Sequence, residues 1–226
     1  MSETLRNPGG DDALARTRKR QIFLAVTRVL ARKSFHEASV REIALEAGIA
    51  AGSIYVYLSG KDEILLLIAE SMVGELVEAL PAIRAENSAD PRDELLAVMH
   101  VALGVIDRYR EAFAVLNHEL RYLEQRPEYR GALKEVLHPY KSALADPLER
   151  GRARGLIHFE NLPSVVEALH MLCSGLAMGA SMLAKTDKET YWREIAAIVR
   201  GRFFGADSVP APDPPSRPNP PSGGDA

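Results

Sequence analysis

Few side chains in the sequence are spaced for catalysis. His118-Glu119 begins like the zinc-binding helix of a protease, but Tyr122 stands where the second histidine would have to lie. The sequence has no Gly-x-Ser-x-Gly turn, and its single cysteine, Cys173, lies in an apolar stretch where a buried, unreactive thiol is expected. We therefore expect neither an enzyme nor a metal site, and no cofactor.

The basic residues are concentrated near the N-terminus. Residues 1–61 hold ten Lys or Arg side chains against six Asp or Glu, although the whole chain carries a net charge of −3. A basic segment attached to an acidic body favours contact with a polyanion such as DNA.

Residues 39–61 have the pattern of two short helices that cross closely. Ser39 can cap the first helix, with Glu42 three residues later completing a capping box. Gly48 can supply the backbone freedom that ends this helix and turns the chain. A second helix is predicted over residues 51–57, and these side chains face outward from it, where they can meet DNA: Ala51, Ser53, Tyr55, Val56 and Tyr57.

This stretch resembles the DNA-binding domain of the TetR family of bacterial repressors. The matching pattern is Arg41-x-Ile43-Ala44-x-x-Ala47-Gly48-Ile49-Ala50-x-Gly52-Ser53-Ile54-Tyr55-x-Tyr57-Leu58-x-x-Lys61, preceded by Phe35-His36-Glu37-Ala38-Ser39 and a basic helix. The resemblance covers about 50 residues. It implies a dimeric repressor that binds a palindromic operator in double-stranded DNA and responds to a small molecule.

The resemblance also implies a role for each matching residue. Ser39 would bind a phosphate at a helix N-terminus, and Arg41 would reach a base edge, plausibly guanine. Tyr55, Tyr57 and Lys61 would contact phosphates. The remaining residues would enter the major groove, with the valine against a thymine methyl group: Ala51, Gly52, Ser53 and Val56.

Two features of this segment leave room for other interpretations. The tyrosines could instead cover the small core, and Arg41 could be a solvated surface charge. Three residues also depart from the usual family pattern, namely Ala50, Leu58 and Gly60. The missing cap at Ala50 is expected to cost about 1 kcal/mol of local helix stability.

The rest of the sequence predicts an all-α protein of two domains. We expect a disordered N-terminus (1–12), a three-helix DNA-binding domain (13–61), a helical ligand-binding and dimerisation bundle (62–205) and a disordered Pro-rich tail (206–226). Capping and proline signals predict helices over about 12–33, 39–48, 51–57, 61–81, 92–109, 111–124, 127–152, 163–185 and 188–204.

The predicted bundle is rich in apolar side chains that could line an effector pocket. Candidates are Leu65, Ile68, Met72, Met99, His100, Leu103, Asn117, Leu120, Arg121 and Met178. Residues 113–158 are similar to the corresponding region of fatty-acid-degradation repressors within the family, through Leu116-Asn117-His118-Glu119-Leu120-Arg121, Leu137, Tyr140 and Gly155-Leu156-Ile157. That similarity implies a long-chain acyl-CoA as effector.

Small residues near the C-terminal end predict a homodimer interface. Residues 174–181 are rich in Gly, Ala and Ser, so a second helix can approach closely. The last helix would complete a four-helix bundle with the symmetry mate through Ile195, Ile198, Val199 and Phe203.

Two other functions compete with that of a ligand-gated repressor. One is a helical enzyme with a basic appendage, which the absence of a catalytic constellation disfavours. The other is a constitutive DNA-binding protein without an inducer. No signal peptide or membrane span is predicted, and the single cysteine favours a reducing compartment, so we expect a cytoplasmic protein.

Overall fold

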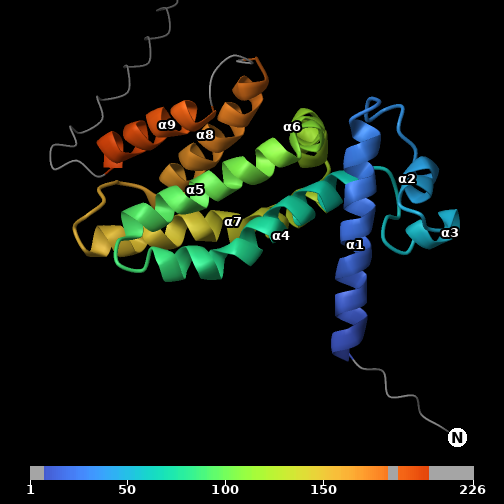
Figure 1. The fold of residues 1–226 in the computed structure, drawn as a ribbon, viewed down its shortest axis with the longest axis horizontal. Coiled ribbons are helices and arrows are strands. Elements are labelled where there is room, and N and C mark those ends of the chain that lie inside the picture. Colours follow the sequence, from blue (N-terminus) through green and yellow to red (C-terminus); the bar gives the residue numbers. More distant parts are fainter. Residues whose placement is uncertain (1–7, 183–187, 204–226) are drawn as a thin grey trace, which may run out of the picture.

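The computed structural model describes residues 8–182 and 188–203, which fold into nine α-helices and no strand (Figure 1). In chain order they are α1 (Pro8–Leu30), α2 (Val40–Glu46), α3 (Ala51–Ile54), α4 (Glu63–Glu86), α5 (Pro91–Arg108), α6 (Arg110–Glu124), α7 (Pro127–Ala153), α8 (Leu162–Met182) and α9 (Lys188–Phe203). The all-α prediction is confirmed. The predicted Pro-rich tail and residues 1–7 lie outside the described residues.

The long helix α1 separates the small helices from the body of the molecule. Helices α2 and α3 lie against one side of α1, and α4 passes its other side into a layered bundle with α5 and α7 (Figure 1). Helix α8 packs on α5 and α7, and α9 packs on α5. No helix among the described residues is long and apolar enough to cross a membrane.

Two helix ends differ by four or five residues from the sequence prediction. Helix α1 begins at Pro8, so residues 8–12 are helical rather than disordered; a proline in the first helical turn is well tolerated. Helix α4 was expected to stop at Pro81 but continues to Glu86. The extra turn buries Ile83 in the body and is closed by the Asn87 side chain, which donates to the Ile83 carbonyl at 2.8 Å.

The second helix of the crossing pair is also shorter than predicted. Helix α3 covers only Ala51–Ile54, and residues 55–57 form turns rather than helix. The short helix follows Ala50, whose side chain makes no capping bond, as expected.

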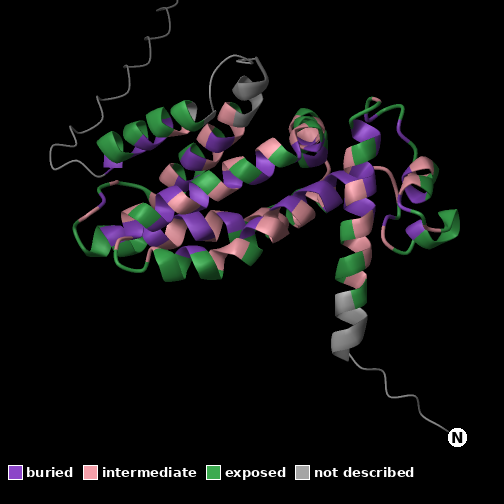
Figure 2. Cartoon of the chain, viewed as in Figure 1, coloured by how far each residue is buried: buried purple, intermediate pink, exposed green. Residues whose placement is uncertain are grey.

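Buried side chains form two hydrophobic clusters. Figure 2 shows the buried residues in purple along the helices. The first, here called the head core, joins α1, α2 and α3 to α6 and to the first half of α4 as far as Met72. The second, the body core, contains the rest of α4 from Leu76 with α5, α7, α8 and α9. The head core therefore extends past residue 61, where the sequence placed the domain boundary.

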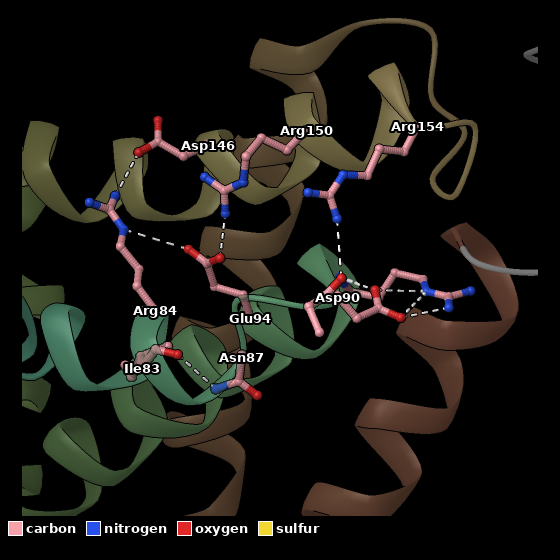
Figure 3. A network of polar contacts seen from close by, with 10 residues as sticks. Ile83, Arg84, Asn87, Asp90, Glu94, Asp146, Arg150 and Arg154 are labelled. Atoms are coloured by element: carbon pink, nitrogen blue, oxygen red, sulfur yellow. Dashed lines mark hydrogen bonds and ion pairs between the residues drawn. The ribbon is translucent and has the colours of Figure 1, made fainter.

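A polar network fastens the end of the body farthest from the head (Figure 3). Glu94 is only 4% exposed, and its carboxylate pairs with Arg150 of α7 and with Arg84 of α4. Arg84 also bonds Asp146 at 2.7 Å. These contacts join α4, α5 and α7 and leave the buried carboxylate paired, as a buried charge requires.

Candidate DNA-binding interface and effector body

The crossing of α2 and α3 depends on small residues and one glycine turn. Ala44 and Ala47 are buried, which brings α2 close to its neighbours. Gly48 has a φ of +67°, a left-handed conformation that favours glycine. The Gln21 amide of α1 donates to the Ala47 carbonyl at 2.6 Å, so the turn is also tied to α1. Ile54, the last residue of α3, is fully buried in the head core and holds this helix in place.

The N-terminus of α2 has the predicted cap. Ser39 has extended backbone, and its hydroxyl accepts from the Glu42 N–H at 3.2 Å. The Glu42 carboxylate pairs with Lys33 at 2.8 Å, and this hydrogen bond is the main cause of its lowered pKa. Arg41 is exposed beside this cap. The helix start therefore presents a hydroxyl and a guanidinium on the same turn.

The segment after α2 presents the predicted groove residues to solvent. Ala51, Gly52 and Ser53 are exposed on α3. Tyr55 is 56% exposed and Val56 is 80% exposed, so neither covers the core. Tyr57 is half-buried and packs against the head core, which agrees in part with the alternative interpretation for this tyrosine.

Lys61 lies before α4, and its ammonium group is engaged within the protein. Its Nζ donates to the His36 carbonyl at 2.8 Å and lies 4.9 Å from the centre of the Phe35 ring. Glu63, the first residue of α4, accepts from the Ser59 backbone N–H at 2.7 Å. Lys61 therefore holds the loop before α2. It also follows residues 51–57, here called the recognition segment, by only a few positions.

Part of the basic charge of α1 is neutralised by α2, which sequence reasoning missed. Glu46 of α2 pairs with Arg28 at 2.6 Å and with Arg32 at 2.5 Å. Hydrogen bonds from Arg32 first, and then from Arg28, lower its pKa. These partners are 14 and 18 residues away in sequence, so no local pattern indicates the contact.

The predicted pocket residues divide between the two hydrophobic cores. The apolar ones Leu65, Ile68, Met72 and Leu120 belong to the head core, whereas Met99 and Leu103 belong to the body core. Asn117 is half-buried and Arg121 is exposed. The side chain of Met178 lies outside the described residues. Their assignment to a pocket stays a prediction.

One predicted pocket residue does line a groove between α5 and α9. This groove has a volume of about 540 Å³, and its walls include Asp93, Leu96, His100, Trp192 and Arg200. The His100 and Trp192 rings stack with their centres 4.8 Å apart. The mixture of charges along the groove favours no single class of ligand.

Helices α6 and α7 contact the head at polar junctions that the sequence did not predict. Asp62, at the start of α4, pairs with Arg126 before α7 and accepts from the Tyr122 hydroxyl of α6 at 3.3 Å. His36 Nε2 lies 3.2 Å from a Glu119 carboxylate oxygen of α6. These contacts link the start of α4 and the loop before α2 to α6 and to the start of α7.

A second set of contacts lies farther along α4, at Glu70 and Glu75. The Tyr109 ring packs edge-on against Phe23 of α1 with centres 4.7 Å apart. Its hydroxyl donates to Glu75 of α4 at 2.9 Å, and Glu75 also pairs with Arg108. Lys19 of α1 pairs with Glu70 of α4 at 2.7 Å. The head is therefore fixed to α4 at several points.

Three residues assigned to the dimer interface pack inside their own chain. Ile195, Val199 and Phe203 are buried in the body core because α9 lies on α5. Ile198 is 64% exposed on the opposite face of α9, and Met171 is exposed on α8. Among the described side chains of α8 and α9, the large apolar ones that are exposed are Met171 and Ile198.

The head, with an exposed recognition segment after a glycine turn, defines a helix-turn-helix DNA-binding protein. Residues 22–68 match the family model described as bacterial regulatory proteins, tetR family. Residues 22–68 therefore form a DNA-binding domain of the TetR type, and the proteins that share it are transcriptional regulators rather than enzymes.

Relatives of known name support the family assignment. The chain is 28% identical over 137 residues to the fatty acid metabolism regulator protein of Bacillus subtilis (strain 168), covering 61% of this chain and 69% of that protein. FadR from B. subtilis in complex with stearoyl-CoA superposes with a TM-score of 0.69 and 23% identity, over 84% of this chain and 98% of that chain. FadR from Bacillus halodurans gives a TM-score of 0.66 at 23% identity, over 81% and 94%.

Proposed function

We propose that this regulator is a cytoplasmic homodimeric repressor that an apolar or amphipathic effector, such as a long-chain acyl-CoA, releases from a palindromic operator. The observation that carries the proposal is the course of α4. This helix begins next to the recognition segment, contributes Leu65, Ile68 and Met72 to the head core, and continues from Leu76 into the body core. A displacement of α4 in the body therefore moves the head.

The DNA contacts follow from the exposed surface of the head. Ser39 and Arg41 at the start of α2 and the exposed residues of α3 would face the major groove, with Tyr55 directed to a phosphate. Two such heads must lie about 34–36 Å apart to meet successive major grooves. An effector that alters this spacing would weaken operator binding.

The polar junctions give the effector a route to α4. Arg126 lies at the start of α7 and pairs with Asp62 at the start of α4, while α6 reaches Asp62 through Tyr122. A ligand that shifts α6 or α7 would change both contacts together. An effector that prefers the DNA-free arrangement by 100-fold changes the equilibrium by about 2.7 kcal/mol.

A homodimer would use the exposed face of α8 and α9. Met171 on α8 and Ile198 on α9 are large exposed apolar residues. Gly175, one helical turn after Met171, is also exposed. Met171→Glu together with Ile198→Glu is expected to give a monomer by sedimentation and to abolish binding to the palindrome. A dimer that survives both substitutions would contradict this interface.

An acyl-CoA effector is supported by the relatives. The named relative with 28% identity is a fatty acid metabolism regulator, and a structural neighbour was solved with stearoyl-CoA. The abundant apolar side chains of the body suit an acyl chain.

The test begins with selection of bound fragments from genomic DNA to obtain the operator. Acyl-CoAs of increasing chain length are then titrated with and without operator. We expect long chains to bind, and operator to weaken their binding by the same factor by which they weaken operator binding. Binding by no chain length would reject the acyl-CoA effector. Equal binding with and without operator would reject the gating mechanism and favour a constitutive DNA-binding protein.

A further inference from the structure

Two buried polar atoms at the contact between α7 and α8 have no hydrogen-bond partner among the nitrogen and oxygen atoms of the described residues. They are the Tyr140 hydroxyl on α7 and Nδ1 of His170 on α8. Tyr140 is only 6% exposed and lies among the apolar side chains of the body core. Buried polar atoms are almost always paired in folded proteins, because an unpaired one forfeits the hydrogen bonds it made in water. Two such atoms on neighbouring side chains therefore point to a place where a polar ligand group can bind.

The two side chains lie together across the contact between α7 and α8. Their rings meet edge to face with centres 5.6 Å apart. Cys173 lies one helical turn after His170 and is fully buried, and its thiol lies within reach of a weak hydrogen bond from the Tyr140 hydroxyl. A thiol is only a weak hydrogen-bond acceptor, so it does not replace an oxygen partner.

The chemistry of this cluster selects an uncharged group. Burial raises the pKa of Cys173 to about 11, raises the pKa of Tyr140 well above its usual value, and lowers the pKa of His170. All three side chains are therefore neutral near pH 7. The nearest ammonium group, on Lys141, is paired with Glu167 at 2.6 Å. A carboxylate or phosphate would find no partner of opposite charge, whereas a carbonyl oxygen can accept from the tyrosine hydroxyl.

We propose that Tyr140 and His170 anchor the polar group of the effector, and that this group is an uncharged oxygen on a long apolar chain, such as the carbonyl of a thioester. This assignment rests on the proposed ligand response and names the part of the ligand that the body recognises. The anchor is also well placed to act on the head. Tyr140 is on α7, and Arg126 immediately before α7 binds Asp62.

The experiment compares two probes on the wild-type protein and on Tyr140→Phe. Stearoyl-CoA carries the thioester carbonyl, and its thioether analogue S-octadecyl-CoA lacks only that oxygen. Tyr140→Phe is expected to weaken stearoyl-CoA binding about three- to tenfold and to leave thioether binding unchanged, because one hydrogen bond is lost only with the thioester. The ligand-free variant should melt at the same or a higher temperature, since it loses an unpaired hydroxyl.

Tyr109→Phe is the matched control for stability. Tyr109 is also a buried tyrosine, but its hydroxyl donates to Glu75 at 2.9 Å. Its removal should lower the melting temperature. His170→Phe keeps the ring contact and should show the same thioester-specific loss as Tyr140→Phe.

The possible outcomes separate the anchor from the proposed function. Equal losses for both probes, or a Tyr140→Phe variant that melts at a lower temperature and binds both probes normally, would overturn the anchor while leaving the repressor intact. If the wild-type protein binds neither CoA compound, the acyl-CoA effector is rejected, and decan-1-ol decides the anchor. Decan-1-ol binding that weakens in Tyr140→Phe supports it, and an absent or unchanged response overturns it.

Discussion

The head core and the body core differ in how their polar groups are satisfied. In the head, the Gln21 amide reaches the Ala47 carbonyl, Ser39 caps α2, and Glu46 pairs with two arginines of α1. In the body, Glu94 is paired at the far end, but Tyr140 and His170 remain without partners in the middle. The paired groups of the head hold one geometry for DNA, whereas the Tyr140 and His170 atoms leave the body able to gain contacts from a ligand.

The largest expected effect separates the two cores directly. Ile54→Ala removes a fully buried side chain beneath α3 and should cost about 2–5 kcal/mol. We expect a lower melting temperature and loss of specific operator binding, because the recognition segment loses its support. Thermal denaturation and operator titration measure the two effects.

Leu144→Ala is the matched substitution in the body core, where the leucine is equally buried. It should lower the melting temperature by a similar amount while the folded protein still binds operator. If both variants lose operator binding equally at a temperature where both are folded, the two cores do not behave as separate units.

A smaller effect tests the exposed face of the head. Arg41→Ala should relax preference at one base pair per half-site, by about 1–3 kcal/mol, if Arg41 reads a base.

Lys61→Ala should weaken binding to all DNA sequences alike and lower the slope of affinity against salt concentration by about one unit. It should also lower the melting temperature, since Lys61 binds the His36 carbonyl. Titrations on operator, mutated operator and random DNA distinguish them, and equal losses on all three for both variants would contradict the assignment.

The junction between head and body should affect communication more than binding. Asp62→Asn weakens the pair with Arg126. We expect the coupling free energy between operator binding and effector binding to fall by about 0.5–2 kcal/mol, which lowers the factor by which operator weakens effector binding. Asp146→Asn breaks a comparable pair with Arg84 at the far end of the body and should leave this factor unchanged. A similar change in both variants would show that the Asp62 contact has no special role.

The smallest effect concerns the acid stability of the head. The pKa of Glu46 is lowered from 4.5 by Arg32 and Arg28, so its stabilising contribution is present above pH 4.5 and is lost as the pH falls through the lowered value. Glu46→Gln should reduce the loss of stability in this acid range, as followed by circular dichroism. Arg32→Gln removes the main partner and should flatten the curve in the same way. An unchanged acid transition in both variants would count against the ion pairs.

The features that follow from local spacing were predictable. The Ser39 cap, the Gly48 turn and the uncapped Ala50 each involve residues within a few positions of one another, and their conformations depend on backbone hydrogen bonds over the same distance. The all-α fold follows from the same short-range periodicity. Residues 55–57 were less predictable, because a short helix and a turn have similar sequence requirements.

Contacts between distant segments were decided only by packing. The sequence placed a helix end at Pro81, but burial of Ile83 against the body outweighs the missing proline N–H. Asp62 and Arg126 are 64 residues apart, so their pairing depends on how α4 and α7 lie together. The same holds for Tyr140 and His170. Whether a polar side chain finds a partner depends on which helices surround it, and local periodicity carries no information about that arrangement.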